Sequence, residues 1–330
     1  MKLPIIKSAI LAGGLALGAS SAYAGDALTV VSWGGAYTKS QIEAYHKPYT
    51  AKYGTKIQSE DYNGGLAEIR AQVEAGKITW DVVDLEVSDA ARGCDDGLFE
   101  KISAGSLPNG VNGALPSKDF IPGALQECAV GTIVWSTIYA YDADKYKSEK
   151  PATISDFFNV KKFPGKRGMR KVPKVNLEWA LMADGVDGKD VYKVLATKAG
   201  QDRAFKKLDT IKNDVLWWEA GAQPPQMLAD GEVVMTSAYN GRIFNAAVAE
   251  KKNFEIVWDR QLFSFDLYAI IKGTPRFKEA LRYVQFSTAS EQLANQARWI
   301  SYGPTRKSSI KLISTHATAG IKMMPHMPTA

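Results

Sequence analysis

Aromatic and acidic side chains recur at or near the ends of segments that the sequence predicts to be β-strands. The set comprises Trp33, Tyr37, Glu86, Trp135, Tyr239 and Asp266. Ligands of open α/β sheets bind outside the carboxyl ends of the strands, and an aromatic face and a carboxylate both attract an ammonium group. Each aromatic residue taken alone is equally well explained as part of the core. Taken together, the residues predict a binding site for a cationic ligand.

The sequence offers little material for a catalytic centre. Of its 3 His residues, His46 lies in a segment of helical pattern and the other two lie in the weakly patterned tail. A Ser-His-Asp or Cys-His site is therefore hard to assemble. The chain also has no G-x-S-x-G motif, no Walker loop and no G-x-G-x-x-G after its first strand. We expect a protein that is not an enzyme and uses no cofactor or metal ion, although a hydrolase relying on carboxylates alone would leave no short motif.

The first 24 residues have the features of a signal peptide. Lys2 and Lys7 precede an apolar run over 9–19, and Ala22-Tyr23-Ala24 supplies the small-x-small pattern that signal peptidase cleaves. We expect cleavage after Ala24 and export, which the resemblance described below narrows to a periplasmic location. The whole chain has a formal net charge of +6, to which these two lysines contribute, and no run of Lys or Arg. Nucleic acid is therefore not an expected partner.

The chain has 2 Cys, Cys94 and Cys128. In an exported protein an even number of cysteines most often forms disulfides. A bridge between these two would add about 3 kcal/mol of stability by restricting the unfolded chain. Two buried free thiols remain the alternative. A zinc site is a weaker interpretation, because two thiols without a nearby His cannot complete one.

Strand-like and helix-like segments alternate along the chain, which predicts an α/β architecture. In its first part, strand-like runs over 28–33, 56–62 and 80–85 alternate with helical patterns over 38–53 and 66–75. Such units form a parallel sheet with right-handed crossovers. Further strands are predicted over 132–141, 232–238, 254–258 and 267–271, and further helices over 177–183, 202–211, 275–289 and 291–297, while 153–170 is rich in Pro, Gly and Lys.

Four segments carry a more specific pattern. They are Leu-Thr-Val-Val-Ser-Trp-Gly-Gly-Ala-Tyr over 28–37, Ala-Gly-Lys followed by Trp-Asp-Val-Val within 75–83, Leu-Ala-Asp-Gly-Glu-Val over 228–233 and Lys-Gly-Thr-Pro over 272–275. They resemble the periplasmic substrate-binding proteins of ABC importers, and within that superfamily the spermidine/putrescine-binding branch. The likeness covers nearly all of the chain after the signal peptide.

The resemblance implies the two-lobed type II periplasmic-binding-protein fold, an α/β fold in which two crossover strands form the hinge. Lobe 1 would comprise residues 25–137 together with 264–330, and lobe 2 would comprise residues 138–263. The lobes would close over a ligand in the cleft between them. The protein would act as a monomer and deliver its ligand to a membrane ABC permease.

The resemblance also assigns roles to individual residues. Trp33 and Tyr37 correspond to aromatic residues that line the polyamine site, and Asp266 corresponds to the Asp that holds an ammonium group. Glu86 stands where the family usually has a Ser, and Tyr239 where it often has a Trp. Tyr302 corresponds to an aromatic residue near the C-terminal end of the family's sequences. The implied function is the capture of putrescine or spermidine. The aromatic rings would enclose the methylene chain, and Glu86 and Asp266 would neutralise the ammonium groups.

Arg242 departs from that pattern, because polyamine binders tend to carry an Asp there. An Arg repels a second ammonium group but pairs with a carboxylate. The alternative ligand is therefore a zwitterionic ω-amino acid such as 4-aminobutyrate, with Arg242 on the acid and Asp266 on the amine. Arg242 would play no part if it faced solvent or paired with a carboxylate of its own protein. A ferric-ion binder using Tyr139 and Tyr141 and a secreted hydrolase are the remaining alternatives.

Overall fold

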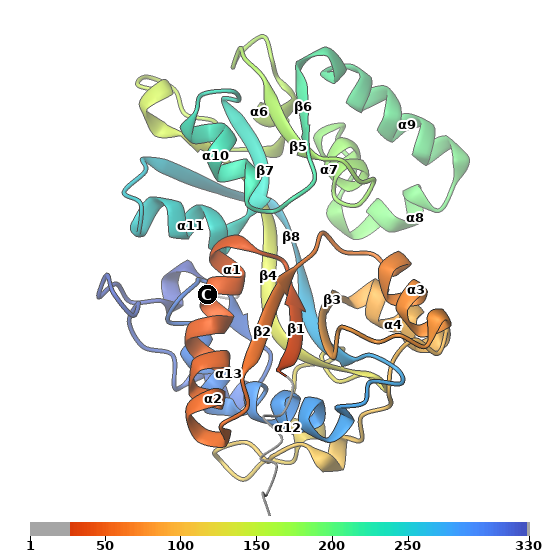
Figure 1. Cartoon of the computed structure of the whole chain (residues 1–330). Helices are drawn as coiled ribbons and strands as arrows, with labels where there is room; N and C mark the ends of the chain where they lie inside the picture. The colour runs from red at the N-terminus through yellow and green to blue at the C-terminus, as the bar shows by residue number, and fades with distance from the viewer. Residues whose placement is uncertain (1–26, 329–330) are drawn as a thin grey trace, which may run out of the picture.

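Two α/β halves, one above the other in Figure 1, are joined by a pair of long strands. This computed structural model describes residues 27–328, so the expected signal peptide and its cleavage site after Ala24 lie outside the described residues. The strands form one sheet in the order β2-β1-β3-β8-β4-β7-β5-β6, with β9 paired to β4. Parallel strands make up both ends of this sheet, and the antiparallel pair β4 and β8 lies between them.

The lower half in Figure 1 contains three parallel strands, β1 (Leu28–Ser32), β2 (Ile57–Asp61) and β3 (Val82–Glu86). Its helices are α1 (Gly35–Gln41), α2 (Lys47–Tyr53), α3 (Ala67–Ala75), α4 (Val87–Asp95) and α5 (Pro116–Asp119). Successive strand residues point to opposite faces, and both faces are covered. Val82 packs in one cluster with Tyr45, and Val83 packs in another with Ile69 of α3. Burial on both faces explains the near-continuous apolar runs of β1 and β3, whereas the edge strand β2 is largely polar and only partly buried.

One unbroken helical segment follows β1, in which α1 passes through a π-helical turn over Ile42–His46 into α2. The sequence predicted one helix here with its start at Thr38, but the helix begins earlier, immediately after the strand. Gly34 and Gly35 have φ angles of 71° and 59°, values that side chains with a Cβ avoid. The glycine pair therefore makes the tight turn that places Tyr37 directly beyond the carboxyl end of β1.

The upper half contains β5 (Arg167–Arg170), β6 (Val215–Trp218) and β7 (Met235–Tyr239), which are parallel to one another. Its helices are α6 (Ile154–Phe158), α7 (Asn176–Ala183), α8 (Val191–Leu195), α9 (Lys198–Asp209), α10 (Gln223–Ala229) and α11 (Asn240–Val248). The segment 153–170 thus contains α6 and β5, although its composition suggested neither. Thr153 and Asp156 form a capping box at the start of α6, and these local hydrogen bonds stabilise a helix too short to show a periodic pattern.

The long strands β4 (Ala129–Asp142) and β8 (Phe254–Ile270) run antiparallel from one half into the other. The sequence predicted two separate strands over 254–258 and 267–271, and the structure corrects this to one. The intervening residues are partly exposed and show no alternating pattern. Residues 262–266 are nevertheless held by pairing with β4, Thr137 with Leu262 for example, and the register shifts just before them, where Arg260 has a φ angle of 56°. Both expected lobe boundaries fall inside these two strands.

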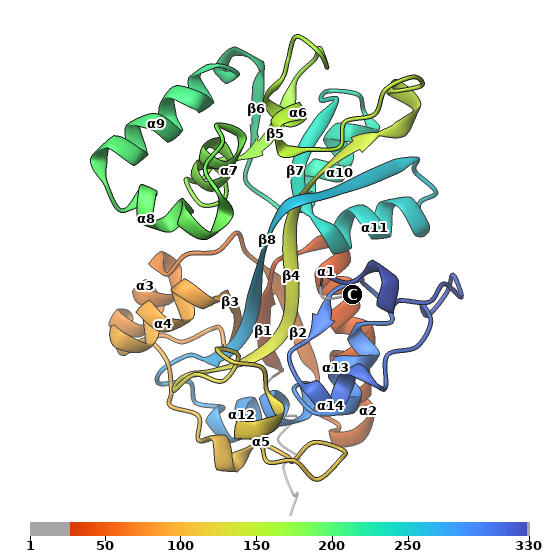
Figure 2. The same cartoon turned by 180° about the vertical axis from the view of Figure 1, so that it is seen from behind.

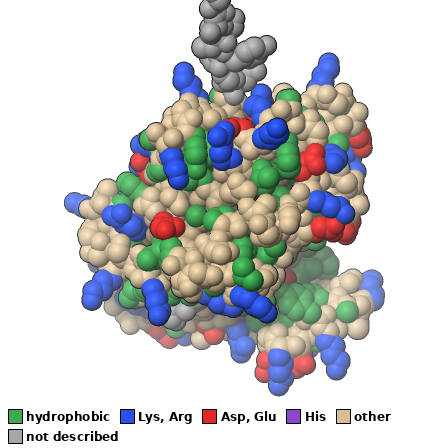
Figure 3. Space-filling view, turned by 90° about the horizontal axis from the view of Figure 1, so that it is seen from below, with side chains coloured by type: hydrophobic (Ala, Val, Ile, Leu, Met, Phe, Trp, Pro, Cys, Tyr) green, Lys and Arg blue, Asp and Glu red, His purple; other side chains and the backbone are tan. Residues whose placement is uncertain are grey.

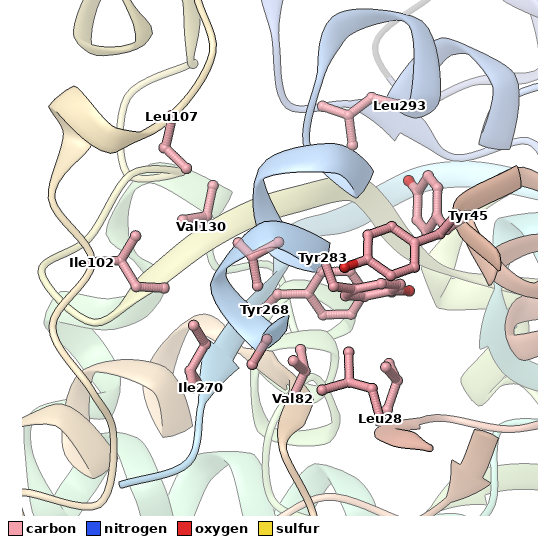
Figure 4. Packing of buried hydrophobic residues seen from close by; sticks show 14 of the residues in the cluster. Leu28, Tyr45, Val82, Ile102, Leu107, Val130, Tyr268, Ile270, Tyr283 and Leu293 are labelled. Atoms are coloured by element: carbon pink, nitrogen blue, oxygen red, sulfur yellow. The ribbon is translucent and has the colours of Figure 1, made fainter. Parts of the chain in front are cut away.

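After β8 the chain returns to the lower half (Figure 2). It forms α12 (Phe277–Ser287), α13 (Ser290–Gln296), the short strand β9 (Gly303–Pro304) and α14 (Lys307–Ile310). Figure 4 shows the core that results, in which Tyr268 and Tyr283 lie beside Tyr45 among aliphatic side chains of β1 and β3. The C-terminal residues therefore complete the core that the N-terminal residues begin.

A disulfide joins Cys94 of α4 to Cys128, the residue before β4. The sequence prediction of this bridge is confirmed, and the alternative of two free thiols is set aside. The bridge ties the helix that follows β3 to the start of a long strand. It lies in the lower half, in the cluster that contains Phe99.

The surface of the lower half, viewed from below in Figure 3, carries Lys and Arg side chains scattered among acidic and apolar ones. On this face the basic side chains do not merge into one continuous patch. Within residues 27–328, no helix has both the length and the apolar character needed to cross a bilayer.

Candidate functional site

A cavity lies where the two halves meet, with about 280 Å³ of space free of atoms when the solvent at its mouth is included. It is lined by Trp33, Tyr37, Glu86, Ile133, Trp135, Tyr239, Arg242, Asp266 and Tyr302. The structure therefore brings together all of the ligand-binding residues that the sequence suggested and adds Ile133. They converge because β1, β3 and β7 all end here, so that the cavity lies beyond the carboxyl ends of parallel strands.

Asp266 supplies a carboxylate without a counterion. It lies inside β8 and not at the start of a strand, as the sequence had suggested, and only 4% of it is exposed. Its Oδ1 accepts a hydrogen bond of 2.6 Å from Nε1 of Trp135. Burial raises the pKa of Asp266 well above its usual value, and the neighbouring carboxylates of Asp84 and Glu86 raise it further. Among residues 27–328, no Lys, Arg or His forms an ion pair with it.

Glu86 is already paired with cations of the protein. Its Oε1 lies 3.0 Å from Nη1 of Arg170, and its Oε2 pairs with Nζ of Lys174. Burial alone would raise the pKa of Glu86, but Lys174 and Arg170 outweigh this effect and hold the pKa below its usual value. The sequence predicted that Glu86 neutralises a ligand ammonium group. In the structure its charge is taken by two side chains of the other half, a contact that no local pattern could indicate.

Arg242 reaches across the cavity from α11. Its Nη1 donates to the backbone oxygen of Gly34 and its Nη2 to that of Trp33, both at 2.9 Å. Its Nε is buried and has no hydrogen-bond partner. Because Arg242 is only 4% exposed and forms no ion pair among the described residues, it neither faces solvent nor pairs with a carboxylate of the protein. Both arrangements that would have removed it from the site are therefore excluded.

The aromatic residues form the apolar walls of the cavity. The rings of Tyr37 and Tyr302 meet edge to face with centroids 5.6 Å apart, and those of Trp135 and Tyr239 do so at 5.0 Å. Burial raises the pKa of each of the three tyrosines, so their hydroxyls stay protonated at neutral pH. The indole Nε1 of Trp33 is buried without a partner. Together these rings exclude water from the space beside the carboxylate of Asp266.

The sequence analysis missed Asp84, a fully buried residue of β3. Its Oδ2 accepts hydrogen bonds from the hydroxyl of Tyr37 at 2.8 Å and from Nε2 of Gln41 at 2.5 Å, whereas its Oδ1 has no partner. Burial raises the pKa of Asp84 to about 7, and these hydrogen bonds partly oppose the rise. The available signal was an acidic residue between Val83 and Leu85, in a run that otherwise predicts a buried strand.

Arg170 was also missed, since it lies in the segment that predicted no strand. Its guanidinium carbon lies 6.0 Å from the ring centroids of both Trp218 and Tyr239. Trp218 is buried and packs against Tyr239 behind the cavity. By contrast, Trp179 is buried in the core of the upper half and Trp217 is 51% exposed. Neither of these two tryptophans lines the cavity.

Tyr139 and Tyr141, considered as iron ligands, lie in the core of the upper half. The Tyr139 hydroxyl donates to the backbone oxygen of Thr153 and the Tyr141 hydroxyl to Oε2 of Glu255. Neither residue lines the cavity. The described part of the chain also contains no group of three or more His, Cys, Asp or Glu residues arranged to hold a metal ion. These positions speak against the ferric-ion alternative.

Comparisons with known proteins agree with this geometry. Residues 44–329 match the family described as bacterial extracellular solute-binding protein. A Pseudomonas aeruginosa protein named gamma-aminobutyric acid-binding protein is 44% identical over 300 residues, which is 91% of this chain and 83% of that protein.

Solved structures give the same result. The binding protein MotA from A. tumefaciens B6, in complex with glucopine, superposes with a TM-score of 0.82 at 29% identity and covers 92% of this chain and 90% of its own. A structure described as a GABA receptor has a TM-score of 0.73 at 31% identity and covers 88% and 86%. These matches confirm the two-lobed type II fold that the sequence predicted. With a family match over most of its length and a cavity between its halves, the chain belongs to the bacterial extracellular solute-binding proteins.

Proposed function

We propose that this protein is the periplasmic receptor of an ABC importer, that it binds a small zwitterionic ω-amino acid, with 4-aminobutyrate as the first candidate, and that it delivers this ligand to a membrane permease. The observation that carries the proposal is the presence of Asp266 and Arg242 on one buried cavity, each with charge that its own protein leaves unpaired. Two relatives named for binding this compound support the choice of ligand.

Asp266 is the proposed partner of the ligand amine. A buried carboxylate without a cation is strongly destabilising, and an ammonium group beside Asp266 would remove that penalty. Trp135 holds the carboxylate in place through its indole N–H, so that little side-chain freedom is lost when the ligand binds. The surrounding rings attract the same ammonium group through their negative faces.

Arg242 is the proposed partner of the ligand carboxylate. A guanidinium group has five N–H donors, and the backbone oxygens of Trp33 and Gly34 accept from only two of its nitrogens. The remaining donors can bind a carboxylate in a charge-assisted manner. Because those same two bonds join α11 to the end of β1, the side chain is already held in place before the ligand arrives.

The position of Arg242 on the cavity ranks 4-aminobutyrate above a polyamine. A diamine would place its second ammonium group towards Arg242, and like charges repel. Putrescine and spermidine, which the sequence resemblance favoured, are therefore second candidates.

Closure of the two halves over the ligand is the proposed mechanism. The lobes would comprise residues 25–137 with 264–330 and residues 138–263, with β4 and β8 as the hinge. Two groups of contacts hold the halves together around the cavity: Glu86 with its two cations, and Arg242 with the backbone after β1. A ligand that bridges Asp266 and Arg242 would add to these contacts and favour the closed form.

Isothermal titration calorimetry with four matched compounds tests the proposal. 4-Aminobutyrate carries both charges, n-butylamine lacks the acid, butyrate lacks the amine and putrescine replaces the acid by a second amine. We expect 4-aminobutyrate to bind at least about 100-fold more tightly than either singly charged compound, since each leaves one buried charge unpaired. Tighter binding of putrescine than of 4-aminobutyrate would replace the proposed ligand by a polyamine. Failure of both to bind would contradict the amine site itself.

A further inference from the structure

Three carboxylates project from one face of the sheet beside the cavity. Residues two apart on a strand point to the same side. Strand β3 pairs with β8 so that Asp84 lies opposite Tyr268 and Glu86 lies opposite Asp266. Asp84 and Asp266 are therefore diagonal neighbours on the face that also carries Glu86. Such diagonals in antiparallel pairs span about 7 to 8 Å.

Only one of these three carboxylates is neutralised by the protein. Glu86 is paired with Arg170 and Lys174. Asp84 and Asp266 form no ion pair among the described residues, and Oδ1 of Asp84 is buried with no hydrogen-bond partner. Two buried carboxylates this close together that form no ion pair are unfavourable when both are ionised. A proton held by one of these two carboxylates would lower this repulsion.

The other titratable groups around Asp84 supply no positive charge. They are Tyr37, Tyr45, Tyr62, Tyr268 and Tyr283, with Glu86 and Asp266 beyond them, and burial raises the pKa of every one of these tyrosines. His46 packs against Tyr283, but burial lowers its pKa to about 4 and it is neutral at pH 7. Arg242 and Arg170 both act on Asp266, but Arg242 is hydrogen-bonded to backbone oxygens and Arg170 is paired with Glu86. A proton is the simplest remaining source of neutralisation.

We propose that Asp84 is a second acidic determinant of the binding site, and that Asp84 and Asp266 share one proton in the empty closed site and release it to solvent when a ligand ammonium group binds. This inference rests on the proposed function, because it requires a ligand with a protonated amine. The ammonium group keeps its own protons, and the carboxyl proton leaves as a hydrogen ion. The ammonium group of the ligand thus replaces the proton as the positive charge beside the two carboxylates.

The surroundings of Asp84 can accommodate either protonation state. In the ionised state, Gln41 donates through Nε2 to Oδ2 of Asp84, and its own Oε1 is buried without a partner. A half-turn of this amide would bring Oε1 to the carboxyl group, where it would accept the proton of a neutral Asp84. Tyr37 and Ser32 contact the same Oδ2 and keep the side chain in place. The direction of the pKa shifts of both aspartates agrees with a retained proton.

Calorimetry in buffers with different ionisation enthalpies measures the released proton directly. We expect the wild-type protein to release close to one proton per molecule of 4-aminobutyrate bound at about pH 6. Its affinity for 4-aminobutyrate should rise by up to tenfold per pH unit and become independent of pH above about pH 7. The sign follows from linkage, since binding that expels a proton is favoured when protons are scarce. Binding that expels no proton and has the same affinity at both ends of this range would overturn the inference but leave the proposed function standing.

Asp84→Asn removes the ionisable group while keeping its shape. We expect it to release less than half as much proton as wild type and to show a flatter dependence of affinity on pH. Asp184→Asn is the matched control, because Asp184 is exposed and pairs with Arg203 at the surface; it should release as much proton as wild type. Full proton release by a folded Asp84→Asn protein would exclude Asp84 as a partner in the shared proton.

Carbon-13 NMR of the unliganded protein tests the inference without any ligand. We expect one aspartate carboxyl signal to titrate near pH 7, where ordinary aspartates have long been ionised, and to shift when 4-aminobutyrate or putrescine is added. If Asp84→Asn does not fold, this titration of the wild type still decides the question. Ionisation of every aspartate carboxyl below about pH 5 would contradict the inference whatever the ligand proves to be.

Discussion

Glu86 and Asp266 lie opposite each other in the β3–β8 pair, yet the protein treats the two carboxylates differently. Glu86 faces the upper half and is met there by Arg170 and Lys174. Asp266 faces the cavity, where Trp135 donates a single neutral hydrogen bond. The Glu86 pKa is accordingly lowered and the Asp266 pKa raised.

This difference in pairing assigns closure of the two halves to Glu86 and ligand recognition to Asp266, roles that the sequence alone could not distinguish. A carboxylate paired by the protein contributes to closure of the halves whatever the ligand is. A carboxylate left unpaired at a buried position makes the closed form depend on a ligand that brings a positive charge. Variants of the two residues should therefore differ in kind: loss of Asp266 removes ligand recognition, whereas loss of Glu86 weakens closure.

Asp266→Asn should have the largest effect. The amide cannot neutralise an ammonium group, so we expect the affinity for 4-aminobutyrate to fall by at least about 100-fold, as measured by calorimetry. As a control, the Asp184→Asn variant should retain wild-type affinity, because Asp184 is an exposed acidic residue of the upper half. Unchanged binding by a folded Asp266→Asn protein would place the amine elsewhere.

Arg242→Gln should change selectivity more than it changes binding of amines in general. We expect the affinity ratio of 4-aminobutyrate to n-butylamine to fall by about 30-fold, because the carboxylate loses a charge-assisted partner that the amine never used. Measuring the ratio allows for any weakening of closure through lost contacts to Trp33 and Gly34. An unaltered ratio would mean that Arg242 serves closure only.

Glu86→Gln should have a smaller and less selective effect. It leaves Arg170 and Lys174 without their partner and lowers the stability of the closed form, which we expect to weaken all ligands alike by about 5-fold, or 1 kcal/mol. Small-angle X-ray scattering should show a more open average shape. The matched control is Glu219→Gln, which breaks an exposed pair with Lys171. If only ligands with an amine lost affinity, Glu86 would neutralise a ligand ammonium group, as the sequence suggested.

Removal of the disulfide by replacing both Cys94 and Cys128 with Ala should have the smallest effect on binding. The bridge links α4 to the start of β4 in the lower half, and neither cysteine lines the cavity. We expect the free energy of unfolding to fall by about 3 kcal/mol and the ligand affinity to change by less than about twofold. A large loss of affinity would show that this link also positions the cavity.

Strands β1 and β3 could be predicted because their residues are buried on both faces, and the helices between the first strands because apolar residues recur on one side of each helix. Continuous apolar runs then mark the strands, and Gly76 ends α3 in a left-handed conformation as its position suggests. The same reasoning brought Trp33, Tyr37 and Tyr239 to one site, since the carboxyl ends of parallel strands meet. The middle of β8 and the segment of α6 and β5 escaped prediction, because cross-strand pairing and a local cap, not periodicity, define them.

The sequence by itself determined that the chain is an α/β protein with a cysteine pair, and that several aromatic residues and the carboxylates of Glu86 and Asp266 lie near the ends of its strands. These properties follow from local patterns of burial and from the fixed geometry of parallel sheets. Only the tertiary structure decided how charge is distributed among those residues. Glu86 meets Arg170 and Lys174, and Arg242 meets the backbone after β1, because segments distant in sequence approach within hydrogen-bond distance. Asp84 becomes a diagonal neighbour of Asp266 through the pairing of β3 with β8. Electrostatic interactions depend on distance and burial in space, and neither quantity can be read along the chain.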